Sequence, residues 1–304
     1  MPASEARATV ATVATERAVL VRMRAVLPEL RPSEQRIAAL FLADPGAIAE
    51  LSIGELAARS DTSTTSVVRF CKRMGYGHLK ELRMDVLRDV TRERFETAGL
   101  PEVSGDVDRD DSLEDIVAKV SLAETLSIAD TAKVLDVPAL QAAVDAVGSA
   151  HRVDIFGLGA SSFVGLDLQQ KLTRIGRTAL NWSDSHAAWT SATTMRSGAV
   201  AIAVSHSGST VDTVEFLSIA RAAGATTIAI TNHEGSPIVE HADIVLTTAA
   251  RESVFRSGAL GSRIAQLMVV DCIFIGVAQA SYEESMEAIR NTYAVVHNLR
   301  TRRS

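Results

Sequence analysis

The chain has 304 residues, of which 47% are hydrophobic and 22% are charged, and its formal net charge at pH 7 is −6. This composition is typical of a globular protein with enough apolar material for two domains or one large one. The two cysteines, Cys71 and Cys272, exclude a disulfide framework, and neither belongs to a His/Cys cluster with metal-ligand spacing. We therefore expect no structural metal and no cofactor.

The sequence predicts neither a signal peptide at its N-terminus nor a membrane span. Residues 1–16 lack the basic start and the apolar stretch of a signal peptide. The most apolar long segment, residues 267–280, is shorter than the roughly 18 residues of a membrane span and contains Asp271. We expect a cytoplasmic protein with no membrane partner.

The charge is distributed unevenly along the chain. Residues 1–98 contain 15 Lys and Arg against 13 Asp and Glu, whereas the remainder has a net charge of −8. The strongest basic bias lies in residues 59–94, with nine basic and five acidic groups. A basic segment in an acidic protein indicates a polyanionic partner, although solvated helix faces can have the same composition.

The N-terminal third predicts short amphipathic helices in succession. Proline residues separate the first two and follow the second, and Ser52 with Glu55 forms a capping box at the start of the third. Residues 99–112 (GLPEVSGDVDRDDS) have no periodicity and predict a linker. We expect a helical domain over 1–98 and a second domain over 113–304. The predicted helices cover residues 18–27, 33–43, 52–60 and 64–74, and a further one runs from 79 to 90.

The helices at 52–60 and 64–74 have the spacing of a helix-turn-helix. Asp61 occupies a turn position that often needs a positive φ. In the second helix Val67, Val68, Phe70 and Cys71 are assigned to the core. Outward hydroxyl and basic side chains can contact DNA phosphates and base edges. An ordinary helical hairpin is the alternative interpretation. The candidate DNA-binding residues are Ser63, Thr64, Thr65, Ser66, Arg69, Lys72, Arg73 and Lys80.

The rest of the chain predicts an α/β domain. Residues 113–148 have a helical pattern, and apolar strands then alternate with helices, which indicates a parallel sheet covered on both faces. Ligands of such sheets bind beyond the C-terminal ends of the strands. The predicted strands cover residues 152–158, 178–183, 199–204, 226–231 and 244–248, and longer helices cover about 257–280 and 284–300.

Two polar loops follow predicted strands. Residues 205–210 (SHSGST) combine hydroxyls and one glycine before a helix N-terminus, a setting that suits an anion, although a capped turn has the same residues. Residues 157–162 (GLGASS) form the second loop. A dinucleotide fingerprint would need glycine at position 162, where this chain has Ser162, so nucleotide binding is disfavoured.

Residues 30–84 resemble the N-terminal domain of RpiR-type bacterial transcriptional regulators, most specifically in SVVRFCKRMGYGHLKEL (66–82) and LSIGELA (51–57). Residues 152–280 resemble the sugar isomerase (SIS) domain that follows in that family. Its matching segments are FGLGASS, SDSH, SHSGST, AITNHEGSPI and FRSGALGSRIAQL, in this order. The departures are Asp61-Thr62, where a Gly-Val-like turn is expected, and Arg31 in place of a hydroxyl N-cap.

The resemblance implies that the two polar loops bind a phosphorylated sugar. The phosphate would be held by Ser161, Ser205, Ser207 and Thr210, with Ser162 close by, while His206 orders its loop. His186 would contact sugar hydroxyls, or a cap by Asp184 or Ser185 would account for its segment. Arg256, Ser257 and Arg263 are further candidates. The full candidate ligand set is Gly159, Ser161, Ser162, His186, Ser205, His206, Ser207, Gly208 and Thr210.

We expect a DNA-binding regulator whose operator affinity is modulated by a sugar phosphate, without catalysis. The resemblance also implies a homodimer or homotetramer that binds a palindromic operator. The alternative is a sugar-phosphate isomerase or aminosugar-phosphate lyase with an appended helical domain. That reaction needs a base beside the C2 proton of the sugar, for which Glu252 and His186 are the candidates.

Overall fold

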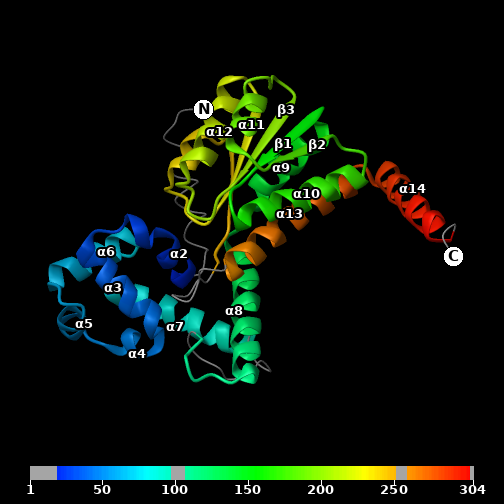
Figure 1. Ribbon diagram of the computed structural model, residues 1–304. Coiled ribbons are helices and arrows are strands. Elements are labelled where there is room, and N and C mark those ends of the chain that lie inside the picture. Colours follow the sequence, from blue (N-terminus) through cyan, green and yellow to red (C-terminus); the bar gives the residue numbers. More distant parts are fainter. Residues whose placement is uncertain (1–18, 97–106, 251–258, 302–304) are drawn as a thin grey trace. The chain divides into compact units, whose positions relative to one another are not determined.

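The computed structural model describes residues 19–96, 107–250 and 259–301, without the side chains of 91–96 and 295–301. The chain divides into two compact units, Met1–Ser104 and Gly105–Ser304, which are helical and α/β respectively (Figure 1). The boundary between the units falls within residues 99–112. Glu252, Arg256 and Ser257 lie outside the described residues.

The helical unit is built around one apolar core. Phe41 and Phe70 stack at its centre with their ring centroids 6.3 Å apart, and Ile37 and Leu56 are fully buried beside them. The helices are α2 (Val19–Val26), η1 (Leu27–Glu29), α3 (Pro32–Ala43), α4 (Pro45–Glu50), α5 (Ile53–Arg59), α6 (Thr64–Arg73) and α7 (Leu79–Glu96).

Helix α4 is absent from the prediction, in which Pro45 only follows the end of the preceding helix. In the structure Pro45 occupies the first position of α4, where its missing N–H is no loss. The Asp44 side chain accepts a hydrogen bond from the backbone N–H of Ala47 at 3.1 Å and caps the new helix. The same two residues therefore end α3 and start α4.

Tyr76 connects the first and last helices of this unit. Its hydroxyl donates to Asp85 Oδ2 at 2.9 Å and accepts a hydrogen bond from the Arg22 guanidinium at 2.7 Å. The Arg22 guanidinium also lies over the Tyr76 ring, 5.4 Å from its centroid. Burial raises the pKa of Tyr76 above its usual range, so the phenol stays protonated and keeps donating.

The α/β unit contains a five-stranded parallel sheet in the order β2-β1-β3-β4-β5, which confirms the predicted fold class. Each strand lies within its predicted range. The strands are β1 (Arg152–Phe156), β2 (Ala179–Trp182), β3 (Ala199–Val204), β4 (Thr226–Thr231) and β5 (Ile244–Thr247), and η2 (Pro237–His241) precedes β5.

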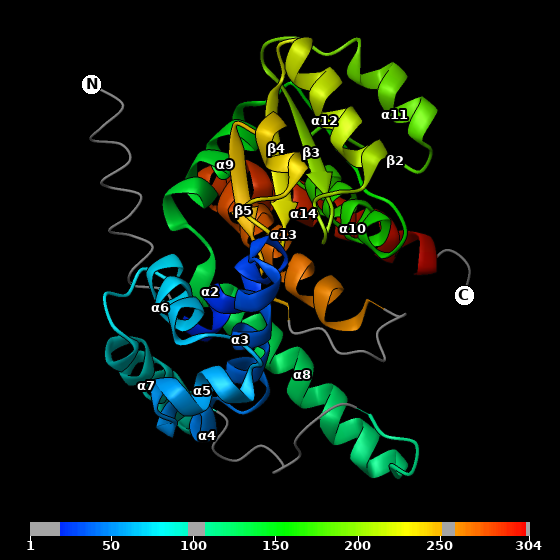
Figure 2. The same cartoon turned by 90° about the vertical axis from the view of Figure 1, so that its left-hand side faces the viewer.

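Helices cover both faces of the sheet (Figure 2). One face packs against α9, α10 and α13, and the other packs against α11 and α12. All six residues of β3 are buried, since Val200, Ile202 and Val204 face the first layer and the alternating alanines face the second. These helices are α9 (Val137–Ser149), α10 (Ala160–Arg174), α11 (Ser185–Ala192), α12 (Val211–Ala222) and α13 (Leu260–Ala280).

The segment predicted as one helical stretch, residues 113–148, is two helices, α8 (Leu113–Val134) and α9. Asp136 ends the first stretch because its carboxylate accepts a hydrogen bond from the Ala139 N–H at 2.9 Å and caps α9. Pro138 follows in the first turn of α9, where proline is tolerated.

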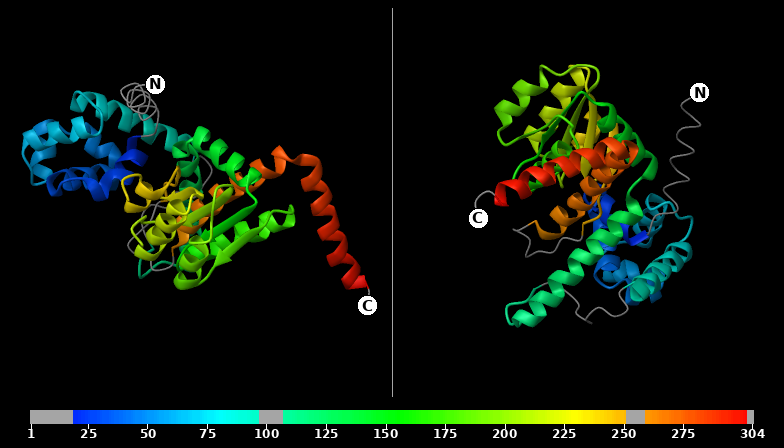
Figure 3. Two further views of the ribbon diagram at one scale, coloured as in Figure 1. Left: turned by 90° about the horizontal axis from the view of Figure 1, so that it is seen from above. Right: turned by 90° about the vertical axis from the view of Figure 1, so that its right-hand side faces the viewer.

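Helix α13 is longer than the predicted apolar segment at 267–280. Among the described residues it is the one helix long and apolar enough to cross a membrane by length and composition. Its Val269, Ile273 and Val277 belong to the core, so packing accounts for this part of its apolar character, whereas Ile275 is 60% exposed. After Ser281 the chain continues as α14 (Tyr282–Thr301) in a new direction (Figure 3).

Candidate ligand site and nucleic-acid interface

The strand order places two polar loops at one point of the α/β unit. β1 and β3 are neighbours, and the chain proceeds outward in opposite directions from them, so the gap beyond their C-terminal ends is the topological switch point. The loop 157–159 follows β1 and the loop 205–210 follows β3. A Cβ built on Gly157 would lie 2.8 Å from the carbonyl oxygen of Val204, which shows how closely the loops approach.

Glycine is required at two positions of the first loop. Gly157 has no room for a side chain, because the same Cβ would also lie 3.0 Å from the Cβ of Ser161. Gly159 has φ +58° and ψ −127°, a conformation that residues with a side chain rarely adopt. The loop is thus shaped so that α10 begins directly at the switch point.

Ser161 and Ser162, which the sequence analysis places in the first loop, lie in the first turn of α10 and have different environments. The buried Ser161 hydroxyl donates to the side-chain carbonyl Oε1 of Gln266 at 3.3 Å. The half-buried Ser162 hydroxyl donates to the backbone carbonyl of Gly159 at 2.7 Å. Ser161 therefore lies inside the site and Ser162 lies at its margin.

The second loop holds its hydroxyls close together. Ser205 is buried, its Oγ accepts a hydrogen bond from the N–H of Gly208 at 3.1 Å, and it lies 3.3 Å from Thr210 Oγ1. Ser207 is exposed, and its Oγ accepts from the N–H of Ser209 at 3.2 Å. Thr210 is the N-cap residue of α12 and makes no side-chain cap bond, so its hydroxyl is available at the helix N-terminus.

These two loops offer an anion uncharged donors. Helices of 15 and 12 residues, α10 and α12, both start at the switch point, so the positive ends of their dipoles and the backbone N–H groups of their first turns lie there. The one carboxylate in the first turn of α12, Asp212, accepts a hydrogen bond from Ser185 Oγ on α11 at 2.9 Å. The arrangement can bind a phosphate through hydroxyls and backbone amides.

The segment after β4 supports the second loop, a role that the sequence pattern did not reveal. The carbonyl of His206 accepts hydrogen bonds from the N–H of Asn232 at 3.1 Å and the hydroxyl of Thr231 at 3.3 Å. A Cβ on Gly208, whose φ is +63°, would overlap the Ser236 side chain. The polar run in AITNHEGSPI was the available signal for this contact.

The histidines lie at the edge of this arrangement. His206 is half-buried with its ring edge-on to that of His233, 5.6 Å between centroids, in keeping with a role in ordering the loop. His186 is exposed in the first turn of α11 and lies edge-on to Trp189 at 5.5 Å. Asp184 caps that helix through the Ala187 N–H at 2.9 Å, as in the alternative interpretation of the SDSH segment. Arg263 lies half-buried in the first turn of α13.

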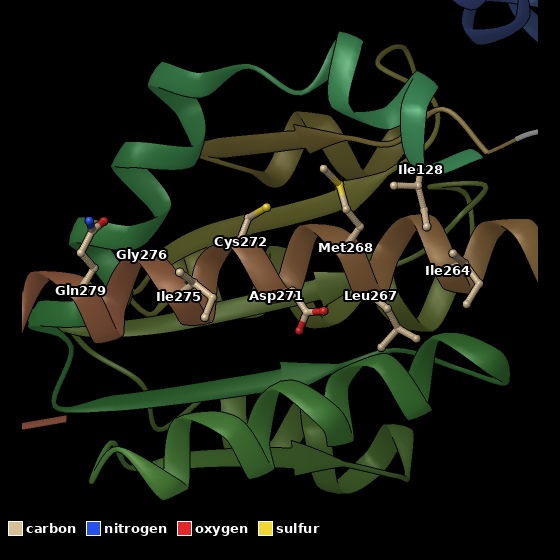
Figure 4. Close-up of a pocket in the computed structure, with 9 residues that line it drawn as sticks. All are labelled: Ile128, Ile264, Leu267, Met268, Asp271, Cys272, Ile275, Gly276 and Gln279. Atoms are coloured by element: carbon tan, nitrogen blue, oxygen red, sulfur yellow. The ribbon is translucent and has the colours of Figure 1, made fainter. Parts of the chain in front are cut away.

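A cavity of about 710 Å³ lies elsewhere, on the side of α13 that faces α8 (Figure 4). Its lining is mostly apolar, with the carboxylate of Asp271 and the amide of Gln279 as its polar side chains apart from the Cys272 thiol. It offers a phosphate no hydroxyl and no cation, so it does not compete with the polar loops as an anion site. The lining residues are Ile128, Ile264, Leu267, Met268, Asp271, Cys272, Ile275, Gly276 and Gln279.

In the helical unit the turn between α5 and α6 has the conformation that the helix-turn-helix pattern predicts. Ser52 and Glu55 form the expected capping box at the start of α5, with bonds of 2.8 and 3.3 Å. Asp61 has φ +50°, and the N–H of Thr62 donates to the carbonyl of Ala57 at 2.9 Å, which closes the end of α5. The turn therefore directs α6 away from α5 without a glycine.

Helix α6 separates its core side chains from a polar face. Val67, Phe70 and Cys71 are buried, whereas the expected outward residues are exposed. They are spaced at i and i+4 in two adjacent rows, so they share one face. One row is Thr64, Val68 and Lys72, and the other is Thr65, Arg69 and Arg73.

Two residues of α6 lie on the opposite face of the helix from the predicted one. Val68, assigned to the core, is 41% exposed and lies within the polar face. Ser66, a candidate DNA contact, is only 5% exposed, and its hydroxyl lies 3.0 Å from that of Ser63. Ser63 itself caps α6 through the Ser66 N–H at 3.2 Å, and Lys80 is exposed in the first turn of α7.

Comparisons with known proteins identify both units. Residues 18–93 match the model of the helix-turn-helix domain of the rpiR family, and residues 148–276 match the SIS domain. An uncharacterized HTH-type transcriptional regulator of Caldanaerobacter subterraneus subsp. tengcongensis is 34% identical over 91% of this chain and 96% of its own. The chain belongs to the RpiR family.

Two further known proteins are similar to this chain over nearly its whole length. The uncharacterized HTH-type transcriptional regulator YbbH of Bacillus subtilis is 32% identical over 93% of this chain and 97% of its own. The solved NanR protein of Vibrio vulnificus, complexed with ManNAc-6P, is 28% identical with a TM-score of 0.58 and covers 92% of this chain and 99% of its own. This RpiR-family protein is a DNA-binding transcriptional regulator with a helix-turn-helix domain and a SIS domain.

Proposed function

We propose that a phosphorylated sugar binds between the loops 157–162 and 205–210 and thereby changes the affinity of the protein for its operator. The observation that carries this proposal is the convergence of two hydroxyl-bearing loops and two helix N-termini at the β1/β3 switch point. Ser161, Ser205, Ser207 and Thr210 would hold the phosphate. The similarity to NanR, which is solved with ManNAc-6P, supports a sugar phosphate as the class of ligand.

The operator would be bound by α6. Its exposed rows carry hydroxyls near the N-terminus and cations toward the C-terminus, and Arg69, Lys72 and Arg73 can contact phosphates or guanine edges. A homodimer or homotetramer would present two such helices to a palindromic operator, with their centres about 34 Å apart on one face of B-DNA. The helical domain over 1–98 and the SIS domain over 113–304 would then carry separate functions, joined by 99–112.

The protein would bind its sugar phosphate without converting it. Apart from His206, to which we assign a role in ordering its loop, the groups that the two loops bring together are hydroxyls and backbone amides, which suit binding, and an isomerase needs in addition a base beside the sugar C2 proton. We test this directly by incubating the protein with aldose, ketose and aminosugar phosphates and measuring product. Sustained turnover that is lost in Glu252→Ala or His186→Ala would contradict binding without conversion and would support the enzyme alternative.

The binding proposal is tested in two steps. A thermal-shift screen over hexose and N-acetylhexosamine 6-phosphates, with ManNAc-6P as the first probe, identifies a ligand because binding to the folded state raises the melting temperature. Fluorescence anisotropy with DNA selected from a random library then measures operator affinity with and without that ligand. We expect at least a fivefold change in Kd and the reciprocal change in ligand affinity. A ligand that binds but leaves the DNA affinity unchanged contradicts the regulatory part.

Ser207→Ala tests the loop itself. The hydroxyl is exposed at the loop surface, so its removal leaves the fold intact and deletes one hydrogen bond to a charged ligand, worth about 1.5–3 kcal/mol or roughly a tenfold or larger loss of affinity. DNA binding without ligand stays unchanged. Ser149→Ala, at an exposed hydroxyl near the end of α9, is the matched control and retains full ligand affinity.

A further inference from the structure

Gln266 is a polar side chain buried in the middle of an apolar helix. It lies on α13 and is 1% exposed. Its hydrogen-bond partner, Ser161, lies 105 residues earlier in the sequence, within the segment 157–162. Its Oε1 accepts the Ser161 hydroxyl proton at 3.3 Å, while its Nε2 has no hydrogen-bond partner among the described residues. A buried donor without a partner destabilises the folded protein, so its retention at this position calls for a reason.

The Ser161 hydroxyl has a single proton to donate. In the structure that proton is directed to Gln266, and the hydroxyl can then only accept. A phosphate is an acceptor and needs the same proton. Ser161 therefore cannot donate to a phosphate and to Gln266 Oε1 at the same time.

Reversal of the Gln266 amide resolves both problems. A rotation of the amide by about half a turn exchanges Oε1 and Nε2, so that Nε2 donates to Ser161 Oγ and Ser161 donates its proton outward. One amide N–H gains an acceptor while Oε1 gives up its Ser161 donor, and the hydroxyl becomes a stronger donor because hydrogen bonds in a chain polarise one another. Nothing else in the pair has to move.

We propose that Gln266 is a positioning residue of the phosphate site, and that its amide reverses when an anion binds so that Nε2–H, Ser161 Oγ–H and the phosphate oxygen form a chain. This inference rests on the proposed function of the two loops and adds a third element to them. α13 packs against α10 and contributes to the core under the sheet, so the relay connects the ligand to the helix that closes this face.

The proposal predicts different effects for two substitutions. Gln266→Glu keeps an acceptor, cannot donate when ionised, and adds a negative charge, so we expect the affinity for a sugar phosphate to fall at least tenfold at pH 8. Gln266→Leu removes donor and acceptor together, which frees the Ser161 proton but leaves it unsupported, and we expect a smaller loss of about threefold. Gln279→Glu, on an exposed part of the same helix, is the charge-matched control and binds like the unmodified protein.

The experiment uses the full chain and measures Kd by calorimetry for the sugar phosphate found by the screen, together with thermal melts of every variant. A double-mutant cycle separates a relay from a packing role. If Gln266 acts through Ser161, Gln266→Leu has no further effect on ligand affinity in the Ser161→Ala background. Additive losses in the cycle, or a Gln266→Glu protein that binds normally, overturn the inference while the phosphate site stands.

A second readout follows the ligand response of the unmodified protein. The side-chain amide signals of Gln266, assigned in ¹⁵N-labelled protein by their loss in Gln266→Leu, should shift on addition of inorganic phosphate or the sugar phosphate and keep their position on addition of the unphosphorylated sugar. Unchanged signals at saturating ligand contradict the relay. A protein that binds no phosphorylated ligand at all contradicts the proposed function as well, which distinguishes the two failures.

Discussion

Arg36 donates a 2.8 Å hydrogen bond from its Nη2 atom to the backbone carbonyl of Asp61, and its Nε donates at 3.0 Å to the carbonyl of the preceding residue. One guanidinium on α3 thus satisfies the carbonyl oxygens exposed where α5 ends. Asp61 is one of two described residues other than glycine with a positive φ. The helix-turn-helix is therefore fixed by a long-range contact in addition to its local turn.

The turn gives a first prediction. Asp61→Ala should lower the free energy of unfolding of the helical unit by about 1–2 kcal/mol, because a residue with a Cβ resists φ +50° and alanine lacks the local polar compensation of aspartate. The free energy of unfolding of Asp61→Gly should equal or exceed that of the unmodified protein, because glycine adopts this conformation freely. Urea unfolding followed by circular dichroism measures both. If Asp61→Ala and Asp61→Gly lower the free energy of unfolding equally, the loss of the carboxylate, and not the backbone conformation, is the cause.

The polar face of α6 gives a second prediction. Arg69→Ala and Arg73→Ala should each weaken operator binding by about 1–3 kcal/mol, roughly 5- to 150-fold, and leave the Kd for the sugar phosphate unchanged. Where the arginine contacts a phosphate, the slope of log K against log salt should decrease by about 1.

Arg88→Ala is the control for these variants. Arg88 is an exposed arginine on α7 that pairs with Asp85 at 2.7 Å. Removal of the Arg88 side chain should change the Kd for DNA by less than twofold relative to the unmodified protein. A variant of α6 that loses DNA binding, ligand binding and melting temperature together is misfolded and would not support the interface.

Gly208 gives a third prediction. Gly208→Ala should abolish sugar-phosphate binding and destabilise the α/β unit by more than about 2 kcal/mol, because its Cβ would overlap Ser236 and its φ is +63°. Gly148→Ala, where a Cβ meets nothing within 4 Å and φ is negative, should stabilise the protein by about 0.5–1 kcal/mol. Thermal melts and ligand titrations compare the pair. Ligand binding retained in Gly208→Ala would move the site away from this loop.

The buried thiol of Cys71 gives a pH prediction. Burial raises the pKa of Cys71 from 9.0 to about 11, so at high pH the unfolded chain loses this proton before the folded protein does. The unfolded state then binds fewer protons, and the free energy of unfolding falls as the pH rises from about 9 to about 11, by up to roughly 2–3 kcal/mol. Below pH 9 the thiol contributes no pH dependence.

Comparison with Cys71→Ala isolates this contribution, because other groups also titrate in that range. The difference in unfolding free energy between the two proteins should shrink between pH 9 and pH 11 by the amount that the thiol contributes. Cys272→Ala retains Cys71 and should keep this decrease, reduced only by the contribution of the Cys272 thiol, whose pKa burial also raises. A constant difference across this range contradicts the prediction.

The strands and the order of the loops could be predicted because they depend on local patterns. A buried strand such as AVAIAV is readable from its composition, and strands that alternate with helices specify a parallel sheet. The predicted helix boundaries differ from those in the structure where one residue serves two purposes. Pro45 both stops α3 and starts α4, and Asp136 interrupts a continuous helical pattern by capping a new helix.

The site could be predicted only in its local parts. The two loops carry their own hydroxyls and glycines, but nothing in the sequence near Gln266 indicates that it contacts Ser161. On α6, the sequence predicts an exposed Ser66 and a buried Val68, whereas the structure shows a buried Ser66 and an exposed Val68. The cause is that a small error in helical phase moves a residue from the core to the surface. Long-range contacts and exact phase come from packing, which a single sequence does not display.

The complete burial of β3 has a consequence for how this protein senses its ligand. The loop 205–210 leaves a strand that is immobilised on both faces, and its backbone carbonyls at His206 and Gly208 are held by the N–H groups of Asn232 and Ile238. A sugar phosphate bound there, as proposed, would meet a preorganised receptor and would not have to order the chain, so a ligand with few atoms could still bind well. We expect binding to be fast and to change the heat capacity little.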